Sequence, residues 1–342
     1  MADDRTKLTY RAAGVDIDVA DEAVKRVRKH ARTTFGPEVI SDLGFFGGLF
    51  ELTGFQKPVL VSSTDGVGTK LKIACALNKH DTIGADLVNH CVNDIFTCGA
   101  RPLFFLDYIA MARLVPEIVE DLVKGMASAL GAVGCALVGG ETAEMPGLYP
   151  DGEYDLAGFI VGAVEKETIL DGRSIQAGDV IVGLPSSGLH TNGYSLARRV
   201  FGIDEDPSPL TQAFPPLGRT LGEELLEPHH CYYAALGPLL PLIKGMAHIT
   251  GGGIPGNLPR VLPEGLAARV RKDSWAIPPI FTLIQERGNI DEEEMYRTFN
   301  MGVGMAIVCS RHNADELSRS VTGARVIGEV VEDRDRQHIA IT

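Results

Sequence analysis

A strand, a glycine loop and a helix follow one another at residues 59–77, and this succession limits the folds that the chain can adopt. The apolar run 59–61 indicates a short buried strand, and residues 71–77 indicate a helix. The loop between them, residues 63–70, contains two glycines, a carboxylate, hydroxyls and a lysine. A loop between a strand end and a helix N-terminus often binds phosphate. The segment therefore predicts a mixed layer of strands and helices that handles a phosphate group.

Each residue type in this loop suits a polyphosphate. Gly66 and Gly68 would let backbone N–H groups approach phosphate oxygens, while Thr69 and Lys70 offer a hydroxyl and a positive charge. Asp65 could hold the Mg²⁺ that accompanies a nucleotide polyphosphate. The spacing is not that of a Walker loop, which needs four residues between its first glycine and a Gly-Lys-Ser/Thr sequence. An ordinary glycine turn with one surface lysine is the alternative explanation.

Strands and helices are mixed in both halves of the chain. A length of 342 residues suits two domains, and we predict an α+β fold of two mixed α/β-layered domains, residues 1–170 and 171–342. The stretch 202–219, with four prolines, is expected to be an excursion loop. The expected helices include 20–34, 69–77, 82–99 and 115–131, and the expected strands include 48–52, 58–62, 103–109, 136–140, 155–165 and 180–184.

Charge and cysteine spacing argue against several classes of function. A net charge of −13 opposes non-specific binding to nucleic acid. The six cysteines contain no CxxC pair, which argues against a zinc cluster or a disulfide framework. No apolar run reaches the length of a membrane span, and the charged segment 1–7 carries no apolar signal. We therefore expect a cytoplasmic protein that binds neither nucleic acid nor membrane.

Three carboxylates lie among small or amide residues, beside or within apolar segments. They are Asp65, Asp94 and Glu141. Mg²⁺ binds through one or two carboxylates together with phosphate oxygens. A helix cap or a surface charge is the ordinary explanation for any one of these residues, whereas the three together predict contact with a metal or a nucleotide.

Two histidines lie beside polar or glycine-rich loops. His190 is surrounded by Ser, Gly and Asn, and His248 precedes the three glycines at 251–253. An imidazole in such a loop can move a proton or contact a phosphate, although a surface histidine explains the local sequence equally well. Three consecutive glycines indicate that the backbone approaches another group closely. These residues predict an enzyme that binds a magnesium polyphosphate, and they leave the reaction open.

Five motifs, in this order along the chain, resemble the signatures of the phosphoribosylformylglycinamidine cyclo-ligase family, also called aminoimidazole ribonucleotide synthetases. The family implies an N-terminal α+β domain whose four-stranded sheet pairs with that of a second subunit into a β-barrel, and a C-terminal α+β domain beside it. It also implies an ATP cleft between the domains, near the dimer interface. The similarity extends from Tyr10 to Gly304, and the motifs are residues 65–70, 92–94, 139–147, 187–195 and 250–253.

The resemblance implies a reaction and roles for these motifs. ATP would drive ring closure of formylglycinamidine ribonucleotide (FGAM) to 5-aminoimidazole ribonucleotide (AIR) through an iminophosphate, leaving ADP and phosphate. The implied partners are ATP, a phosphoribosyl amidine substrate, Mg²⁺ and a second copy of the chain. The implied roles are metal binding by Asp65, Asp94 and Glu141, phosphate binding by Gly66, Gly68, Thr69 and Lys70, catalysis by Asp65, Lys70 and His190, and substrate binding by Ser187, Asn192, Gly251, Gly252 and Gly253.

Relatives that share this architecture are the alternatives. A selenophosphate synthetase is expected to use a cysteine or selenocysteine near its N-terminus, whereas the first cysteine here is Cys75. A hydrogenase maturation factor is expected to end in a cysteine, and this chain ends in Thr342. The motifs around Glu141 and His190 favour the cyclo-ligase over a thiamine monophosphate kinase. A non-catalytic nucleotide sensor, which would bind ATP without a phosphoryl acceptor, is the alternative from another class.

Overall fold

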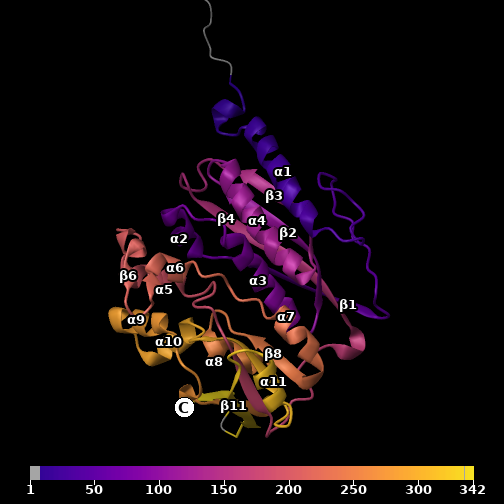
Figure 1. Cartoon of the computed structure of the whole chain (residues 1–342), viewed down its shortest axis with the longest axis vertical. Helices are drawn as coiled ribbons and strands as arrows, with labels where there is room; N and C mark the ends of the chain where they lie inside the picture. Colours follow the sequence, from indigo (N-terminus) through magenta and orange to yellow (C-terminus); the bar gives the residue numbers. More distant parts are fainter. Residues whose placement is uncertain (1–7, 335) are drawn as a thin grey trace, which may run out of the picture.

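The computed structural model describes residues 8–334 and 336–342, which form two packed halves (Figure 1). The first half contains a four-stranded sheet in the order β1-β4-β2-β3. Strands β1 and β2 run antiparallel to β4, and β3 runs parallel to β2. The bounds are β1 (Pro58–Gly66), β2 (Arg101–Met111), β3 (Ala136–Glu144) and β4 (Tyr154–Glu165).

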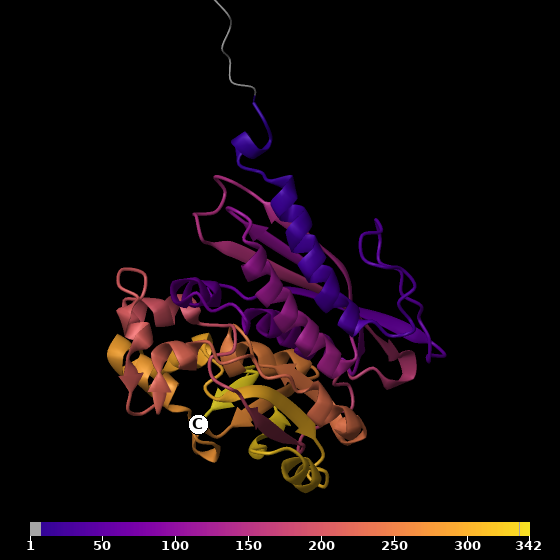
Figure 2. The ribbon, with the colours of Figure 1, turned by 45° about the horizontal axis from the view of Figure 1, so that its top comes forward.

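Helices cover one face of this sheet and leave the other face open (Figure 2). Apolar side chains on the covered face are buried. Phe105 is an example, and it lies near Leu87 of α3. On the opposite face, Leu60 is 62% exposed and Phe159 is 41% exposed. The helices of this half are α1 (Ile17–Ala31), α2 (Lys70–Leu77), α3 (Ile83–Phe96) and α4 (Pro116–Val133).

The second half contains a six-stranded sheet in the order β12-β9-β11-β5-β10-β8, and its strand β10 is buried along its whole length. A separate pair, β6 (Ala213–Phe214) and β7 (Arg219–Thr220), forms a small hairpin. The six strands are β5 (Val180–Pro185), β8 (Ile243–His248), β9 (Leu266–Val270), β10 (Val303–Cys309), β11 (Arg325–Glu332) and β12 (Ile339–Ile341). The helices are α5 (Tyr194–Phe201), α6 (Leu221–Leu225), α7 (Tyr233–Leu236), α8 (Gly253–Asn257), α9 (Pro279–Gly288), α10 (Glu292–Thr298) and α11 (Ala314–Ser320).

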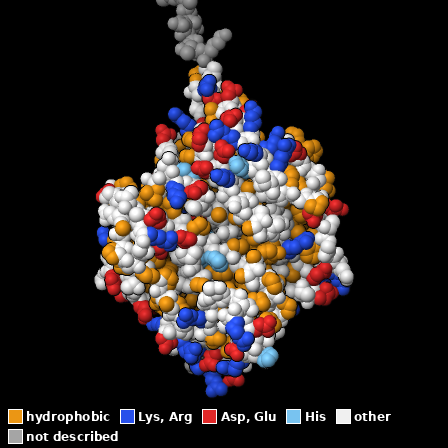
Figure 3. Space-filling model, in the orientation of Figure 1, with side chains coloured by type: hydrophobic (Ala, Val, Ile, Leu, Met, Phe, Trp, Pro, Cys, Tyr) orange, Lys and Arg blue, Asp and Glu red, His pale blue; other side chains and the backbone are white. Residues whose placement is uncertain are grey.

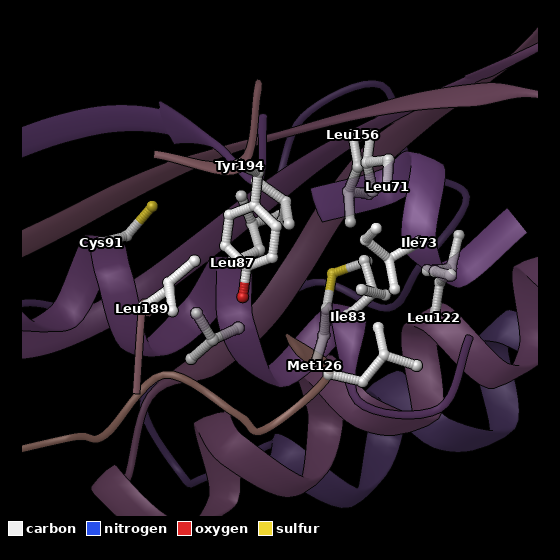
Figure 4. Packing of buried hydrophobic residues seen from close by; sticks show 14 of the residues in the cluster. Leu71, Ile73, Ile83, Leu87, Cys91, Leu122, Met126, Leu156, Leu189 and Tyr194 are labelled. Atoms are coloured by element: carbon white, nitrogen blue, oxygen red, sulfur yellow. The ribbon is translucent and has the colours of Figure 1, made fainter. Parts of the chain in front are cut away.

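The two halves share part of their core. Figure 4 shows Tyr194 of α5 among side chains of the first half, including Leu71, Ile83 and Leu87. The Tyr194 hydroxyl donates a hydrogen bond of 2.6 Å to the carbonyl oxygen of Leu225. Burial of this ring therefore stabilises the contact between the halves.

Two local expectations were wrong. Residues 48–52 form no strand, and the structure has only an isolated bridge there, between Val39 and Phe50. The stretch 202–219 is more ordered than an excursion loop, because it contains a short 3-10 helix with buried Leu210 and most of the β6-β7 hairpin. The predicted domain boundary at residues 170–171 falls between the last strand of the first sheet and β5, and it stays a prediction.

The surface carries charges of both signs. Acidic and basic side chains are interspersed on the face that Figure 3 shows. None of the described helices combines the length and apolar character that crossing a bilayer requires.

Close packing of α3 on α4 depends on glycine. A Cβ atom on Gly84 would lie 2.0 Å from the carbonyl oxygen of Leu122, so we expect Gly84→Ala to lower the free energy of unfolding by about 2–3 kcal/mol. Gly131 of α4 has nothing within 4 Å of such an atom, and Gly131→Ala should raise the free energy of unfolding by about 0.5–1 kcal/mol. Urea unfolding followed by circular dichroism compares the two variants, and equal effects would contradict the packing argument.

Candidate active site

A cavity of about 530 Å³ opens between the two halves. Strand β1 contributes Asp65, and helix α3 contributes His90 and Asp94. The second half contributes His248 from the end of β8 and Arg260 from the segment after α8. Two of the predicted carboxylates therefore meet at the junction of the halves, beside one of the predicted histidines.

The two carboxylates have different environments. Ser63 Oγ lies 3.2 Å from Asp65 Oδ2 and 3.4 Å from Asp94 Oδ2. Burial, followed by the hydrogen bond and charge of Asp94, raises the pKa of Asp65 to about 7. Burial opposes ionisation of Asp94 as well, but the hydrogen bond and charge of His248, the charge of His90 and the hydrogen bond with Asp65 together outweigh it and lower the pKa of Asp94 to about 2. Carboxylate and hydroxyl oxygens at these positions fit a hard cation such as Mg²⁺, which would replace the shared proton.

A chain of buried imidazoles extends from this pair. His248 Nδ1 lies 2.7 Å from Asp94 Oδ1, and its Nε2 lies 2.9 Å from Nε2 of His229. The hydroxyl oxygen of Thr191 lies 3.3 Å from His229 Nδ1 and 3.0 Å from His90 Nδ1, so it links the two rings. Burial lowers the pKa of His90 to about 4 and that of His229 well below its ordinary value, so both rings are neutral.

Lys70 does not line this cavity, and its expected roles in phosphate binding and catalysis stay predictions. Its side chain is fully buried, with Nζ 2.8 Å from Asp86 Oδ1 and 2.7 Å from the carbonyl oxygen of Glu227. Asp86 also accepts a hydrogen bond of 2.7 Å from the backbone N–H of His229. Lys70 therefore joins α2 and α3 to the segment that carries His229. The alternative of a surface lysine is wrong, because the side chain of Lys70 is buried.

The other loop residues lie where the sequence placed them, between β1 and α2. Gly66 is the last residue of β1, and Gly68 adopts a left-handed conformation with φ of 66°. Thr69 is exposed, and its Oγ1 lies 3.1 Å from Oγ of Ser195. Their phosphate contacts stay a prediction.

Glu141 lies far from the other two carboxylates. Glu141 of β3 lies opposite Tyr108 of β2, and Tyr108 lies opposite Ala157 of β4. Ala157 in turn lies opposite Gly66 of β1, the residue next to Asp65. Three strand spacings separate the residues by about 14 Å. Glu141 lines a second cavity, of about 680 Å³, between β3, α1 and the loop around residues 43–48. The predicted three-carboxylate site therefore contains two carboxylates within one chain.

Asp107 lines the same second cavity and is expected to destabilise the fold at high pH. Burial, with a smaller contribution from the charge of Glu141, raises the pKa of Asp107 to about 7. An unfolded aspartate titrates near pH 4, so folding takes up a proton between about pH 4 and 7. The contribution of Asp107 to the free energy of unfolding is fully present below about pH 4 and is lost as the pH rises through about 7.

Asp107→Asn should remove this loss, since an amide stays neutral. We expect its free energy of unfolding to exceed that of the unmodified chain by about 2–4 kcal/mol at pH 8 and to match it at pH 4. Urea unfolding at both pH values measures the difference, with the surface variant Asp151→Asn as control. A difference that does not change with pH would contradict the assignment.

The two loops predicted to receive substrate lie together. A Cβ atom on Gly251 would lie 3.2 Å from Asn192 Oδ1, and the Nδ2 group of Asn192 is buried with no partner within the described ranges. Ser187 Oγ is engaged, because it donates to the carbonyl oxygen of Pro228 at 2.5 Å. Asn192 is therefore the member of this set with a free donor.

The remaining glycines of the triplet serve packing. Gly252 has φ of 94°, and a Cβ atom on Gly253 would lie 1.9 Å from the carbonyl oxygen of Tyr296. The close approach that the sequence indicated is therefore that of α8 to α10. Contact of these two glycines with substrate stays a prediction.

His190 lies behind the imidazole chain and does not line the cavity. Its ring stacks on that of His229 with centroids 4.1 Å apart, and its Nε2 accepts a hydrogen bond of 3.1 Å from the backbone N–H of Ser187. In the structure His190 holds the loop at Ser187, and its expected role as an acid, base or phosphate contact stays a prediction. Sequence patterns did not indicate His90, Thr191, His229 or Arg260; the adjacent histidines at 229 and 230 were the one local signal.

Comparison with known proteins finds matches to one family over both halves of the chain. Residues 52–164 match the family model described as AIR synthase related protein, N-terminal domain, and residues 176–340 match AIR synthase related protein, C-terminal domain. A curated relative from Acetivibrio thermocellus, named phosphoribosylformylglycinamidine cyclo-ligase, is 52% identical over 335 residues, which cover 96% of this chain and 98% of the relative. A relative of the same name from Syntrophotalea carbinolica is 49% identical over 351 residues, with 99% of each chain covered.

Solved structures of more distant proteins share the fold. A thiamine-monophosphate kinase from Stenotrophomonas maltophilia K279a superposes with a TM-score of 0.68 at 18% identity, covering 94% of this chain and 95% of that one. The hydrogenase maturation protein HypE in complex with ATP gives a TM-score of 0.66 at 16% identity, covering 93% and 90%. These similarities confirm the mixed α/β fold predicted from the sequence.

Proposed function

The chain belongs to the phosphoribosylformylglycinamidine cyclo-ligase family, and from this premise we propose that ATP drives closure of FGAM to AIR in the cavity between its halves. The chain is then an enzyme of purine biosynthesis that forms a C–N bond, with ATP as co-substrate. One observation carries the proposal: in a chain about half identical to curated cyclo-ligases, Asp65 and Asp94 from two separate motifs meet in this cavity.

The reaction needs activation of an amide oxygen, which is a poor leaving group. The formyl oxygen of FGAM attacks the γ-phosphorus of ATP, the bond to ADP breaks, and an iminophosphate forms as the amide nitrogen loses its proton. The ribosylated amidine nitrogen then attacks the same carbon, the C–O bond breaks, and phosphate leaves as the nitrogen loses its proton. Such transfers depend mainly on positioning and on neutralisation of phosphate charge.

The residues at the cavity can supply both. Asp65 and Asp94 would hold Mg²⁺, which neutralises phosphate charge when it is bound. Arg260 lines the same cavity and offers a guanidinium to a phosphate. Asn192, with its free donor beside Gly251, would orient the substrate.

The test is a direct assay. The protein is mixed with MgATP and FGAM, and ADP release is followed together with formation of a diazotisable aminoimidazole. We expect one AIR for each ADP, and no ADP when thiamine monophosphate replaces FGAM. ATP binding without AIR formation would refute the proposal, and phosphorylation of thiamine monophosphate would favour the kinase.

We also propose that the open face of the first sheet covers the same face of a second copy. Four strands from each copy would close into a β-barrel, which satisfies the sheet edges. The exposed Leu60 and Phe159 would then be buried.

Phe159→Lys should prevent this association, because a lysine at the centre of the shared face would be desolvated without a partner. We expect a monomer by light scattering under conditions in which the unmodified chain is a dimer. Ile277→Lys, a partly exposed position in the second half, is the matched control and should stay dimeric. A dimeric Phe159→Lys variant would place the interface elsewhere.

A further inference from the structure

The protons of the imidazole chain can be assigned from its end at Asp94. At about pH 8 imidazoles are neutral, and each has one N–H. Ionised Asp94 can only accept, so His248 donates from Nδ1 across 2.7 Å. His248 Nε2 then accepts from His229 Nε2–H across 2.9 Å, which leaves His229 Nδ1 as an acceptor.

Thr191 passes this constraint on to His90. Its hydroxyl donates to His229 Nδ1, so its oxygen accepts from His90 Nδ1–H across 3.0 Å. The lone pair of His90 is therefore on Nε2. That nitrogen lies 3.6 Å from Asp65 Oδ1, beyond hydrogen-bond distance, on a side chain that is 8% exposed and lines the cavity.

We propose that His90 Nε2 is a nitrogen ligand of the divalent metal that Asp65 and Asp94 hold. His90 Nε2 lies 3.6 Å from Asp65 Oδ1, and His90, Asp94 and His248 each place one ligand atom within 4.8 Å of the others, so one ion can reach the imidazole and the carboxylates. His248, hydrogen-bonded to Asp94, then orients a metal ligand from outside the coordination sphere. This inference rests on the metal site of the proposed function and adds a ligand to it.

A second group of histidines, His190, His229 and His248, also has nitrogens within 4.8 Å, but it offers no comparable site. His190 Nε2 accepts from Ser187, so its free Nδ1 carries the proton. His229 Nε2 likewise carries a proton, which it donates to His248. The three lone pairs, on His190 Nε2, His229 Nδ1 and His248 Nε2, are all already engaged in hydrogen bonds.

A nitrogen ligand changes which metal the site prefers. Mg²⁺ takes oxygen ligands almost exclusively, whereas Mn²⁺ and the later divalent ions accept imidazole readily. Coordination by His90 therefore predicts that Mn²⁺ binds more tightly than Mg²⁺ by a margin that depends on this residue.

The test is pulsed electron paramagnetic resonance of the full chain with Mn²⁺ alone at pH 8. We expect a ¹⁴N coupling from one imidazole, replaced by a ¹⁵N coupling when histidine is labelled. His90→Phe should abolish the coupling. It should also lower the Mg²⁺ concentration needed to displace half of the bound Mn²⁺ by about tenfold or more. Thr191→Val, which keeps the imidazole but frees its orientation, should retain the coupling and weaken Mn²⁺ binding a few-fold.

The outcomes separate this inference from the proposed function. Bound Mn²⁺ that is lost in Asp65→Asn but shows no nitrogen coupling would overturn the role of His90 and leave the metal site intact. Mn²⁺ binding that is unaffected by Asp65→Asn would overturn the site itself. The spectrum of the unmodified chain decides between them even if His90→Phe fails to fold.

Discussion

Replacement of Lys70 by methionine is expected to destabilise the folded chain by about 3–5 kcal/mol. Lys70 and Asp86 are both fully buried, and Nζ lies 2.8 Å from the carboxylate. Without the lysine, Asp86 would keep an unpaired charge in a site that water does not reach or would take up a proton, because burial already raises its pKa to about 6. The change would also free the carbonyl oxygen of Glu227, which now accepts from Nζ at 2.7 Å.

Lys72→Met on the same helix is the matched control. Lys72 pairs with Glu153 at the surface and its side chain is 43% exposed, so its loss should cost less than about 1 kcal/mol. Replacement of both members of the buried pair, as Lys70→Met with Asp86→Leu, should cost less than Lys70→Met alone, because no charge is then left unpaired. Urea unfolding measures all three. If Lys70→Met is as stable as Lys72→Met but loses turnover, the lysine contacts phosphate after all.

Lys70 also illustrates where sequence reasoning stops. The spacing of glycines, hydroxyl and lysine is the same whether the lysine faces a phosphate or a carboxylate on the next helix. Asp86 lies 16 residues further along, and only the packing of α2 on α3 decides between the two. Local patterns therefore predicted the strand, loop and helix, but could not predict the direction of the side chain.

The helices and strands themselves were largely predictable. Periodic apolar residues indicated α3 and α4, and continuous apolar runs indicated β2 and β5. The segment 48–52 failed because an apolar run beside glycines resembles a strand whether or not a partner strand is available.

The candidate site was predictable only in part. Asp65 and Asp94 stood out because they follow or interrupt apolar segments, and their contact could be proposed from the family resemblance. The imidazole chain could not, since Thr191 and His90 are 101 residues apart and the motif 187–195, which contains Thr191, does not indicate His90 as a partner. Contacts between the halves are a property of the tertiary fold, which periodicity does not encode.

Asp65→Asn is expected to lower the turnover of FGAM by about a hundredfold to a thousandfold while leaving the fold intact. The pKa of Asp65 is raised to about 7, first by burial and then by Asp94, so the metal-free residue is close to neutral already. An amide has the same shape as the protonated acid and can still donate to Asp94. Stability without metal should therefore not fall, and near neutral pH it should rise as in Asp107→Asn, because an amide takes up no proton on folding.

Loss of turnover without loss of stability is the result that assigns Asp65 to the chemistry. An amide oxygen is a weaker ligand for Mg²⁺ than a carboxylate, so phosphate charge would be poorly neutralised during transfer. Steady-state formation of AIR and thermal unfolding measure the two effects, with exposed Asp151→Asn as the control for a lost surface charge. Unchanged turnover would remove Asp65 from the metal site, whereas a fall in stability equal to that of a core variant would make its role structural. If raising the Mg²⁺ concentration partly restores the variant, the defect lies in metal binding itself, because added metal cannot compensate for a misplaced substrate.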